Sequence, residues 1–207
     1  GVDDQIQYAL EGSVFVAGAA IQWLRDDLRM IDHAAESEEY CKKVKDSNGI
    51  YVVPAFTGLA APYWDPYARG VFFGVSLHTT RKEMNRAIME GCGYGLRQLS
   101  EIAERVTGNK MKEFVSIGGG AKSETWAQIK ADITGKDIII LDMNDMAPVG
   151  AALLAGVGAG VFKDVYEASD KVEKTVYKVV HSSKEHVDVY EKRYQVYTQL
   201  YPQIKEL

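Results

Sequence analysis

The stretch FVSIGGGAKSETWAQIKADITG, residues 114–135, decides the fold of this chain. It begins with an apolar run, passes through three glycines at Gly118, Gly119 and Gly120, and changes to a helical pattern that Gly135 closes. This order predicts a strand, a glycine turn and a helix.

Two interpretations of the turn are open. Glycine lets backbone N–H groups approach a ligand without a Cβ in the way, and a helix start directs unpaired N–H groups and partial positive charge at an anion. Ser123 suits the N-cap of the helix and Glu124 its first turn. The stretch therefore fits a phosphate or nucleotide site. It equally fits an ordinary tight connection in which the glycines serve geometry alone, because short glycine motifs often match by chance.

Two well-known nucleotide motifs are excluded. In a P-loop a glycine stands directly before Lys-Ser/Thr, but here Ala121 precedes Lys122. A Rossmann fingerprint has a third glycine at the position that Ser123 occupies. A nucleotide bound at this turn would therefore belong to another class of site.

The composition is that of a globular protein. The chain has 207 residues, 46% of them hydrophobic and 26% charged, which suits one large domain or two small ones. The net charge of −5 and the lack of a Lys/Arg run argue against a nucleic-acid partner. The apolar runs are too short for a membrane span and the start does not resemble a signal peptide, so we expect no membrane partner and a cytoplasmic location. Cys41 and Cys92 lack metal-ligand spacing, which fits a reduced protein without a metal site of its own.

Upstream of the turn, the sequence predicts short strands and one long helix. Thr80 and Glu83 have the spacing of a capping box at the start of that helix. Gly91, Gly93 and Gly95 lie inside it, and each costs about 1 kcal/mol relative to alanine. Either the helix is broken there or another backbone packs closely against it. The expected elements are a strand at 8–12, helices at 19–28 and within 32–46, strands at 50–56 and 71–77, and the long helix from 80 to 108.

Between the two central strands lies the segment TGLAAPYWDPYARG, residues 57–70. Its two prolines exclude a regular element. Aromatic and charged residues on an anchored loop are typical of a binding loop. A well-packed connector with an internal pair between Asp65 and Arg69 is the alternative.

Downstream of the turn, strands and helices alternate. Residues 138–141 form an apolar run, as in a parallel sheet covered on both faces. The Ala/Gly-rich segment 146–160 predicts a buried helix packed on a sheet, with Pro148 near its start. A short acidic helix at 161–172, an edge strand at 175–180 and a helix at 184–207 with a buried tyrosine stripe follow. The alternation predicts an α/β fold with a partly parallel sheet.

Three ordered blocks of the sequence resemble a known family. They are YALEGSVFVAGAAIQWLRDDL at 8–28, VVPAFTGLAAPYWDPYARGVFFGVS at 52–76 and the opening stretch. Together they resemble the carboxy-terminal domain of the FGGY carbohydrate kinase family. The resemblance implies an actin-like, ribonuclease H-like ATPase domain, with a mixed sheet and helices on both faces.

The resemblance also assigns nucleotide contacts, motif by motif. Gly18 and Gln22 match contacts at the start of the first helix. Gly119 matches the glycine that meets the nucleotide, and Gly118 and Gly120 shape its turn. Ser123 stands where glycerol-phosphorylating members have an asparagine that faces the adenosine. Either Ser123 or its neighbour Glu124 would have to replace that asparagine.

The family's catalytic aspartate has no counterpart in this chain. It precedes the YALEG block by a long segment, whereas only seven residues precede Tyr8 here. Asp4 and Gln5 look like the family's Asp-Gln pair but lie too close to that block. The resemblance thus implies that residues 1–207 are the carboxy-terminal nucleotide-binding domain, without the amino-terminal domain and the first strands of this domain.

The function implied by the resemblance is ATP-dependent phosphorylation of a sugar or polyol hydroxyl, with Mg²⁺. The first block points to glycerol and the glycine block to a ketopentose such as xylulose, which we favour slightly at this stage. The expected partners are ATP, the sugar or polyol, the amino-terminal domain and, as one arrangement, a second copy in a homodimer. The alternative is a non-catalytic nucleotide-binding module, since we expect this chain alone to be inactive.

Overall fold

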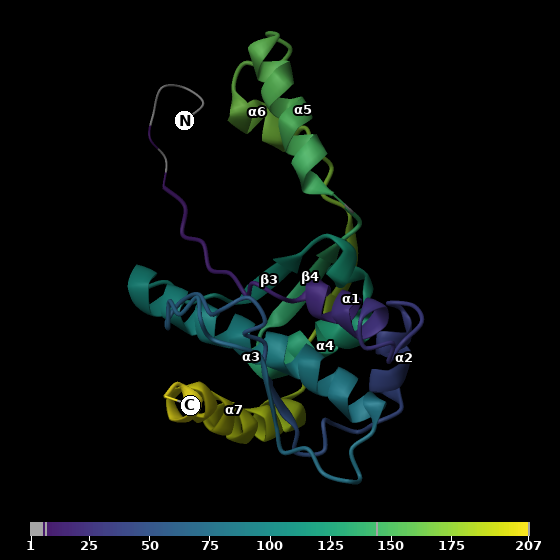
Figure 1. Cartoon of the computed structure of the whole chain (residues 1–207). Helices are drawn as coiled ribbons and strands as arrows, with labels where there is room; N and C mark the ends of the chain where they lie inside the picture. The colour runs from purple at the N-terminus through teal and green to yellow at the C-terminus, as the bar shows by residue number, and fades with distance from the viewer. Residues whose placement is uncertain (1–5, 7, 144, 207) are drawn as a thin grey trace.

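The computed structural model describes residue 6, residues 8–143 and residues 145–206. It is an α/β structure in which short strands alternate with helices (Figure 1). The elements are α1 (Gly18–Asp26), α2 (Glu36–Lys42), β1 (Tyr51–Val53), β2 (Val71–Phe73), α3 (Arg81–Thr107), β3 (Glu113–Ser116), the 3₁₀ turn η1 (Gly119–Lys122), α4 (Glu124–Thr134), β4 (Asp137–Leu141), α5 (Met146–Gly158), α6 (Val165–Asp170), β5 (Val176–Val180) and α7 (Lys184–Ile204).

The main sheet is mixed, as predicted. Its order is β3-β4-β5, with β4 parallel to β3 and antiparallel to β5. Ile138 and Ile140 of β4 are buried against Ala127 and Ala131 of α4, because alternate residues of a strand point to the same face. On the opposite face residues such as Val179 are exposed. Within the described ranges, helices therefore cover one face of the sheet and not both, as had been predicted. β1 and β2 form a separate antiparallel pair, shorter than the predicted strands.

The long helix α3 runs through the centre of the molecule without a break. Thr80 and Glu83 form the predicted capping box, and Gly108 ends the helix in the left-handed conformation, with φ of 72°. A Cβ at Gly91 would lie 2.4 Å from the carbonyl oxygen of Val52 in β1. Close packing of another backbone therefore explains Gly91, whereas Gly93 and Gly95 lie against the side chains of Ile133 and Val14.

The tyrosine stripe of α7 belongs to the core, as predicted. Its buried members pack on Tyr94 of α3, with ring centroids 5.0 Å apart for Tyr197 and 6.2 Å for Tyr190. The Tyr190 hydroxyl donates to Glu90 at 3.0 Å, which satisfies a polar group that would be costly to bury alone. α7 thereby fixes the face of α3 that lies away from the main sheet.

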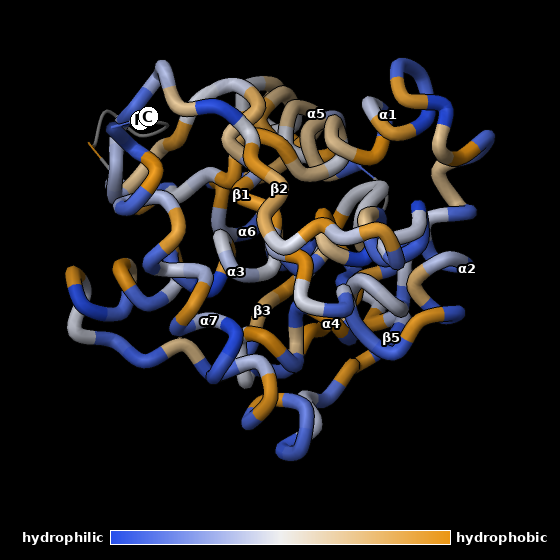
Figure 2. Tube along the Cα trace, turned by 60° about the horizontal axis from the view of Figure 1, so that its bottom comes forward, coloured by the Kyte–Doolittle hydropathy of each residue, from blue (hydrophilic) through white to orange (hydrophobic). Residues whose placement is uncertain are grey.

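The prediction of a buried helix at 146–160 is wrong in this structure. α5 has no buried residue, and Leu154 is 50% exposed. Figure 1 shows α5 and α6 standing apart from the other elements, and Figure 2 shows α5 mostly in hydrophobic colours. Composition predicts an apolar helix, but a helix is buried only where other elements pack against it. Here α5 packs mainly against α6 and Phe162. No helix among the described residues is long and apolar enough to span a membrane.

Two upstream predictions also need correction. Residues 8–12 do not form a strand, because no neighbouring strand pairs with their backbone. Tyr8 is 93% exposed. The first helix ends at Asp26 instead of Leu28, and Leu28 lies outside it with an exposed side chain. The other predicted helices and strands are present, most of them with shorter bounds, and β4 begins one residue earlier than predicted.

Candidate nucleotide-binding site

One cavity of about 480 Å³ lies where the first helix meets the glycine turn. Its volume falls in the range of about 300–1,000 Å³ that is common for small-molecule sites. Four segments form its wall: one side of α1, residues 34–38 at the start of α2, the middle of α3 and the turn from η1 into α4. The lining residues are Gly18, Ile21, Gln22, Arg25, Ala34, Ala35, Ser37, Glu38, Met89, Gly119, Gly120, Lys122, Ser123 and Trp126.

Five of the six predicted site residues meet in this cavity. Gly18 and Gln22 of α1 line it together with Gly119, Gly120 and Ser123. No Cβ contact would arise within 4 Å at Gly18 or Gly119, so these backbones are open to a ligand.

Gly118 is the exception, and the sequence analysis expected it to shape the turn. It is not among the lining residues and instead precedes η1 with φ of 84° and ψ of −175°. Glycine is almost the only residue that adopts this backbone conformation. Gly118 therefore shapes the turn that brings Gly119 to the cavity.

The start of α1 and two cationic side chains contribute positive charge to different parts of the cavity wall. Ala17 caps α1 without a side-chain hydrogen bond, so the first N–H groups of the helix have no side-chain acceptor from their cap. Lys122 and Arg25 also line the cavity, and Arg25 is paired with Asp26 at 2.6 Å. This combination of helix N–H groups and cations suits a phosphate group.

A carboxylate that the sequence analysis did not single out lines another wall. Glu38 of α2 accepts hydrogen bonds from Lys42 at 3.0 Å and from the Thr125 hydroxyl at 3.1 Å. Burial acts to raise the pKa of Glu38, but hydrogen bonds from Lys42, Ser123 and Thr125 outweigh it, so the pKa lies below its ordinary value. Glu38 is therefore a charged acceptor at the cavity.

Ser123 keeps its place in the site and Glu124 does not. The Ser123 hydroxyl accepts from the backbone N–H of Trp126, as predicted for an N-cap, while Ser123 lines the cavity. Glu124 is absent from the lining and pairs with Lys178 of β5 at 2.5 Å. Of the two residues named as alternatives, Ser123 lines the cavity and Glu124 does not.

The apolar floor was also missed by the sequence analysis. Trp126 of α4 lines the cavity beside Met89 of α3 and Ile21 of α1. Its indole N–H donates to the Met89 carbonyl at 3.3 Å, which fixes the ring. A tryptophan in the first turn of the helix, three residues after the N-cap, was the available signal, but on a helical pattern it suggests core packing as readily as a ligand surface.

No dedicated metal cluster is present among the described residues. Residue 6 and residues 8–143 and 145–206 contain no cluster of three acidic, histidine or cysteine side chains that could hold a metal. Magnesium at nucleotide sites uses carboxylates and substrate phosphates. The carboxylate lining this cavity is that of Glu38, and it is already bonded to Lys42.

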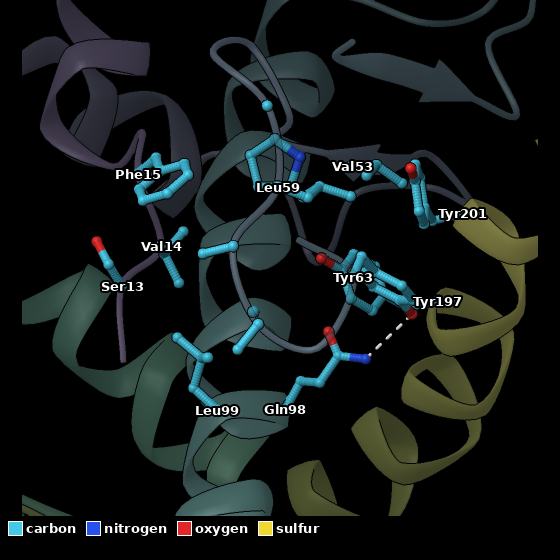
Figure 3. A pocket seen from close by; sticks show the side chains of 15 residues that line it. Ser13, Val14, Phe15, Val53, Leu59, Tyr63, Gln98, Leu99, Tyr197 and Tyr201 are labelled. Atoms are coloured by element: carbon cyan, nitrogen blue, oxygen red, sulfur yellow. Dashed lines mark hydrogen bonds between the residues drawn. The ribbon is translucent and has the colours of Figure 1, made fainter. Parts of the chain in front are cut away.

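A second, smaller cavity lies beside the loop 57–70 (Figure 3). Its volume is about 40 Å³, room for a few water molecules and too little for a nucleotide. Gln98 donates to the Tyr63 hydroxyl at 3.2 Å across this cavity. These features indicate a packing gap between the loop, α3 and α7.

The loop itself is held differently from the predicted way. Asp65 accepts from the backbone N–H of Tyr67 at 2.8 Å and from the hydroxyl of Tyr201 in α7. Arg69 donates to the carbonyls of Tyr67 and Ala68 at 2.9 Å, so the predicted Asp65–Arg69 pair is not formed. Tyr201, which is distant in the sequence, bonds to the Asp65 carboxylate, and Arg69 bonds to the carbonyls of its own turn. The contacts favour the well-packed connector.

The fold is that of an actin-like ATPase domain. The family model described as "FGGY family of carbohydrate kinases, C-terminal domain" matches residues 1–159. The chain therefore belongs to the FGGY family of carbohydrate kinases.

Two proteins of similar sequence are glycerol kinases. The glycerol kinase of Clostridium beijerinckii is 43% identical over 171 residues, which cover 83% of this chain and 34% of that protein. The glycerol kinase of Haemophilus influenzae is 45% identical over 172 residues, 82% of this chain and 34% of that protein. The chain thus spans about a third of the length of these relatives.

Solved structures agree on the fold. The Plasmodium falciparum glycerol kinase with ADP matches with a TM-score of 0.77 and 25% identity, over 90% of this chain and 37% of that one. The ligand-bound xylulose kinase of Lactobacillus acidophilus matches with a TM-score of 0.75 and 23% identity, over 91% and 38%. The predicted α/β, actin-like fold class is confirmed.

Proposed function

We propose that this chain is the ATP-facing domain of a kinase that phosphorylates a polyol or sugar hydroxyl. The observation that carries the proposal is the cavity shared by the start of α1 and the turn at Gly119, whose backbones are open to a ligand. Phosphoryl transfer depends mainly on positioning and on neutralising charge around the phosphates. The N–H groups of α1, the glycine turn and Lys122 would hold the phosphates.

The acceptor hydroxyl would be activated elsewhere in the whole protein. Glu38 is the carboxylate that lines the cavity, and its bonds to Lys42 and Thr125 make it a poor general base. This supports an activating carboxylate on the longer protein that the relatives represent. Closure of the two parts around ATP would then complete the site.

Glycerol is the acceptor that we favour. The relatives with 43–45% identity are named glycerol kinase, which outweighs the slight preference for a ketopentose drawn from the glycine block. A ketopentose such as xylulose remains the second candidate because that block resembles the form of the motif in xylulose-phosphorylating members.

The test compares two glycine variants in the whole protein. A Cβ at Gly119 meets no atom within 4 Å, so Gly119→Val should fold normally and lose ATP affinity by its approach to the nucleotide. Gly150→Val is the matched control, since a Cβ there is equally unobstructed but lies in α5, outside the cavity. Phosphate transfer from ATP–Mg²⁺ to glycerol and to xylulose is measured for each. Unchanged ATP affinity and turnover in Gly119→Val would show that the site is assigned wrongly.

Calorimetry on these 207 residues separates the kinase from a non-catalytic nucleotide-binding module. Tight ATP binding by the chain, together with no transfer to either acceptor by the whole protein, would favour the module. Transfer to one acceptor by the whole protein favours the kinase and identifies its substrate.

A further inference from the structure

The turn before β1 carries an asparagine followed directly by a glycine. Asn48 and Gly49 are both exposed, with φ of 50° and 78°, and the Ile50 N–H donates to the Ser47 carbonyl at 3.0 Å to close the turn. Two central residues with positive φ are typical of a type I′ turn, for which Asn-Gly is a preferred sequence. The backbone of the turn explains this pair of residues but leaves the Asn48 side-chain amide without a structural role.

Both groups that could react with each other in this turn are accessible. Among the described residues, the Asn48 side-chain amide makes no hydrogen bond and the Gly49 N–H has no acceptor. Apart from its chain neighbours, no atom lies within 4 Å of the place where a Cβ of Gly49 would be. Because glycine has no side chain, nothing shields its backbone nitrogen from the asparagine amide that precedes it.

We propose that Asn48 is a site of spontaneous deamidation, through attack of the Gly49 backbone nitrogen on the Asn48 side-chain carbonyl carbon. The new N–C bond closes a succinimide ring, the Cγ–Nδ2 bond breaks, and the Gly49 amide proton leaves with that nitrogen as ammonia. Water then adds to one of the two imide carbonyl carbons and opens the ring. The product at position 48 is aspartate or, where the main chain now runs through the former side chain, isoaspartate.

Either product weakens the attachment of this turn to α7. Asp46 accepts from the Asn48 N–H at 2.7 Å and from Arg193 of α7 at 2.8 Å. A carboxylate at position 48 lies close to that of Asp46, and like charges repel each other. Isoaspartate also lengthens the main chain between Ser47 and Ile50, whose hydrogen bond closes the turn. Deamidation therefore lowers the stability of the fold.

The experiment ages the whole protein at mildly alkaline pH without denaturant and follows each asparagine by peptide mass spectrometry. Asn109 is the internal comparison: it is also exposed, but Lys110 follows it, and a side chain beside the attacking nitrogen hinders ring closure. Product should accumulate several-fold faster at Asn48 than at Asn109. Asn48→Gly is the matched variant, since glycine adopts positive φ without strain and has no amide to lose. Its turn peptide should keep a constant mass.

Thermal unfolding tests the consequence for stability. Asn48→Asp should melt about 2–4 °C below the unmodified protein, and aging should lower the melting temperature of the unmodified protein but not that of Asn48→Gly. Asn109→Asp adds the same charge beyond the end of α3 and should melt normally. Equal rates at Asn48 and Asn109, or product at Asn48 only after unfolding in urea, would overturn the proposed site. An unchanged melting temperature in Asn48→Asp would overturn its consequence for the contact with α7.

Discussion

Substitution of Gly91 by alanine tests the packing of β1 on α3. The added Cβ would lie 2.4 Å from the Val52 carbonyl oxygen, a backbone atom of a fully buried residue that cannot move aside cheaply. Such overpacking costs up to about 3 kcal/mol, and the better helix propensity of alanine returns about 1 kcal/mol. We therefore expect Gly91→Ala to lower the free energy of unfolding by roughly 2 kcal/mol, or the melting temperature by about 4–8 °C.

Two further glycines complete a graded series. At Gly93 the added Cβ would meet the end of the Ile133 side chain at 2.7 Å, which can rotate, so the loss should be smaller. At Gly150 in α5 nothing lies within 4 Å, so alanine should cost nothing and gain up to about 1 kcal/mol. Urea and thermal unfolding followed by circular dichroism measure all three. The reasoning is refuted if Gly91→Ala is as stable as the unmodified protein, or if Gly150→Ala is equally destabilised.

Two predictions concern ionisable side chains. Lys136 and Lys110 lower the pKa of Glu104 from 4.5 to about 2. The ionised carboxylate therefore stabilises the fold fully at pH values above 4.5, and this stabilisation is lost as the pH falls toward 2. Glu104→Gln should therefore flatten the acid side of the curve of unfolding free energy against pH; a curve of unchanged shape would contradict the role of the lysines. Burial raises the pKa of the Cys41 and Cys92 thiols to about 12, so both should react slowly with dithionitrobenzoate at mildly alkaline pH until denaturant is added. Fast reaction of either thiol in the folded protein would show that it is not buried.

Signals between close neighbours in the sequence determined much of the local structure. The capping box at Thr80 and the N-cap at Ser123 are each decided by a few consecutive residues, and both are found as predicted. The strand, glycine turn and helix of residues 114–135 follow from the same kind of signal. The family resemblance placed the glycine contacts near one another before any packing was known.

Tertiary structure decided what these local elements meet. Glu38 reaches Thr125 across 87 positions of the chain, and in the sequence it is one charge in an acidic helix with nothing to separate it from Glu39. The Ala/Gly-rich α5 has the composition of a buried helix, yet its exposure depends on which surfaces lie next to it. Periodicity and capping report each residue's near neighbours, whereas a cavity is made by side chains that folding brings together from distant segments. For this reason the sequence predicted the glycine turn, and only the structure revealed the carboxylate on the α2 wall of the same cavity.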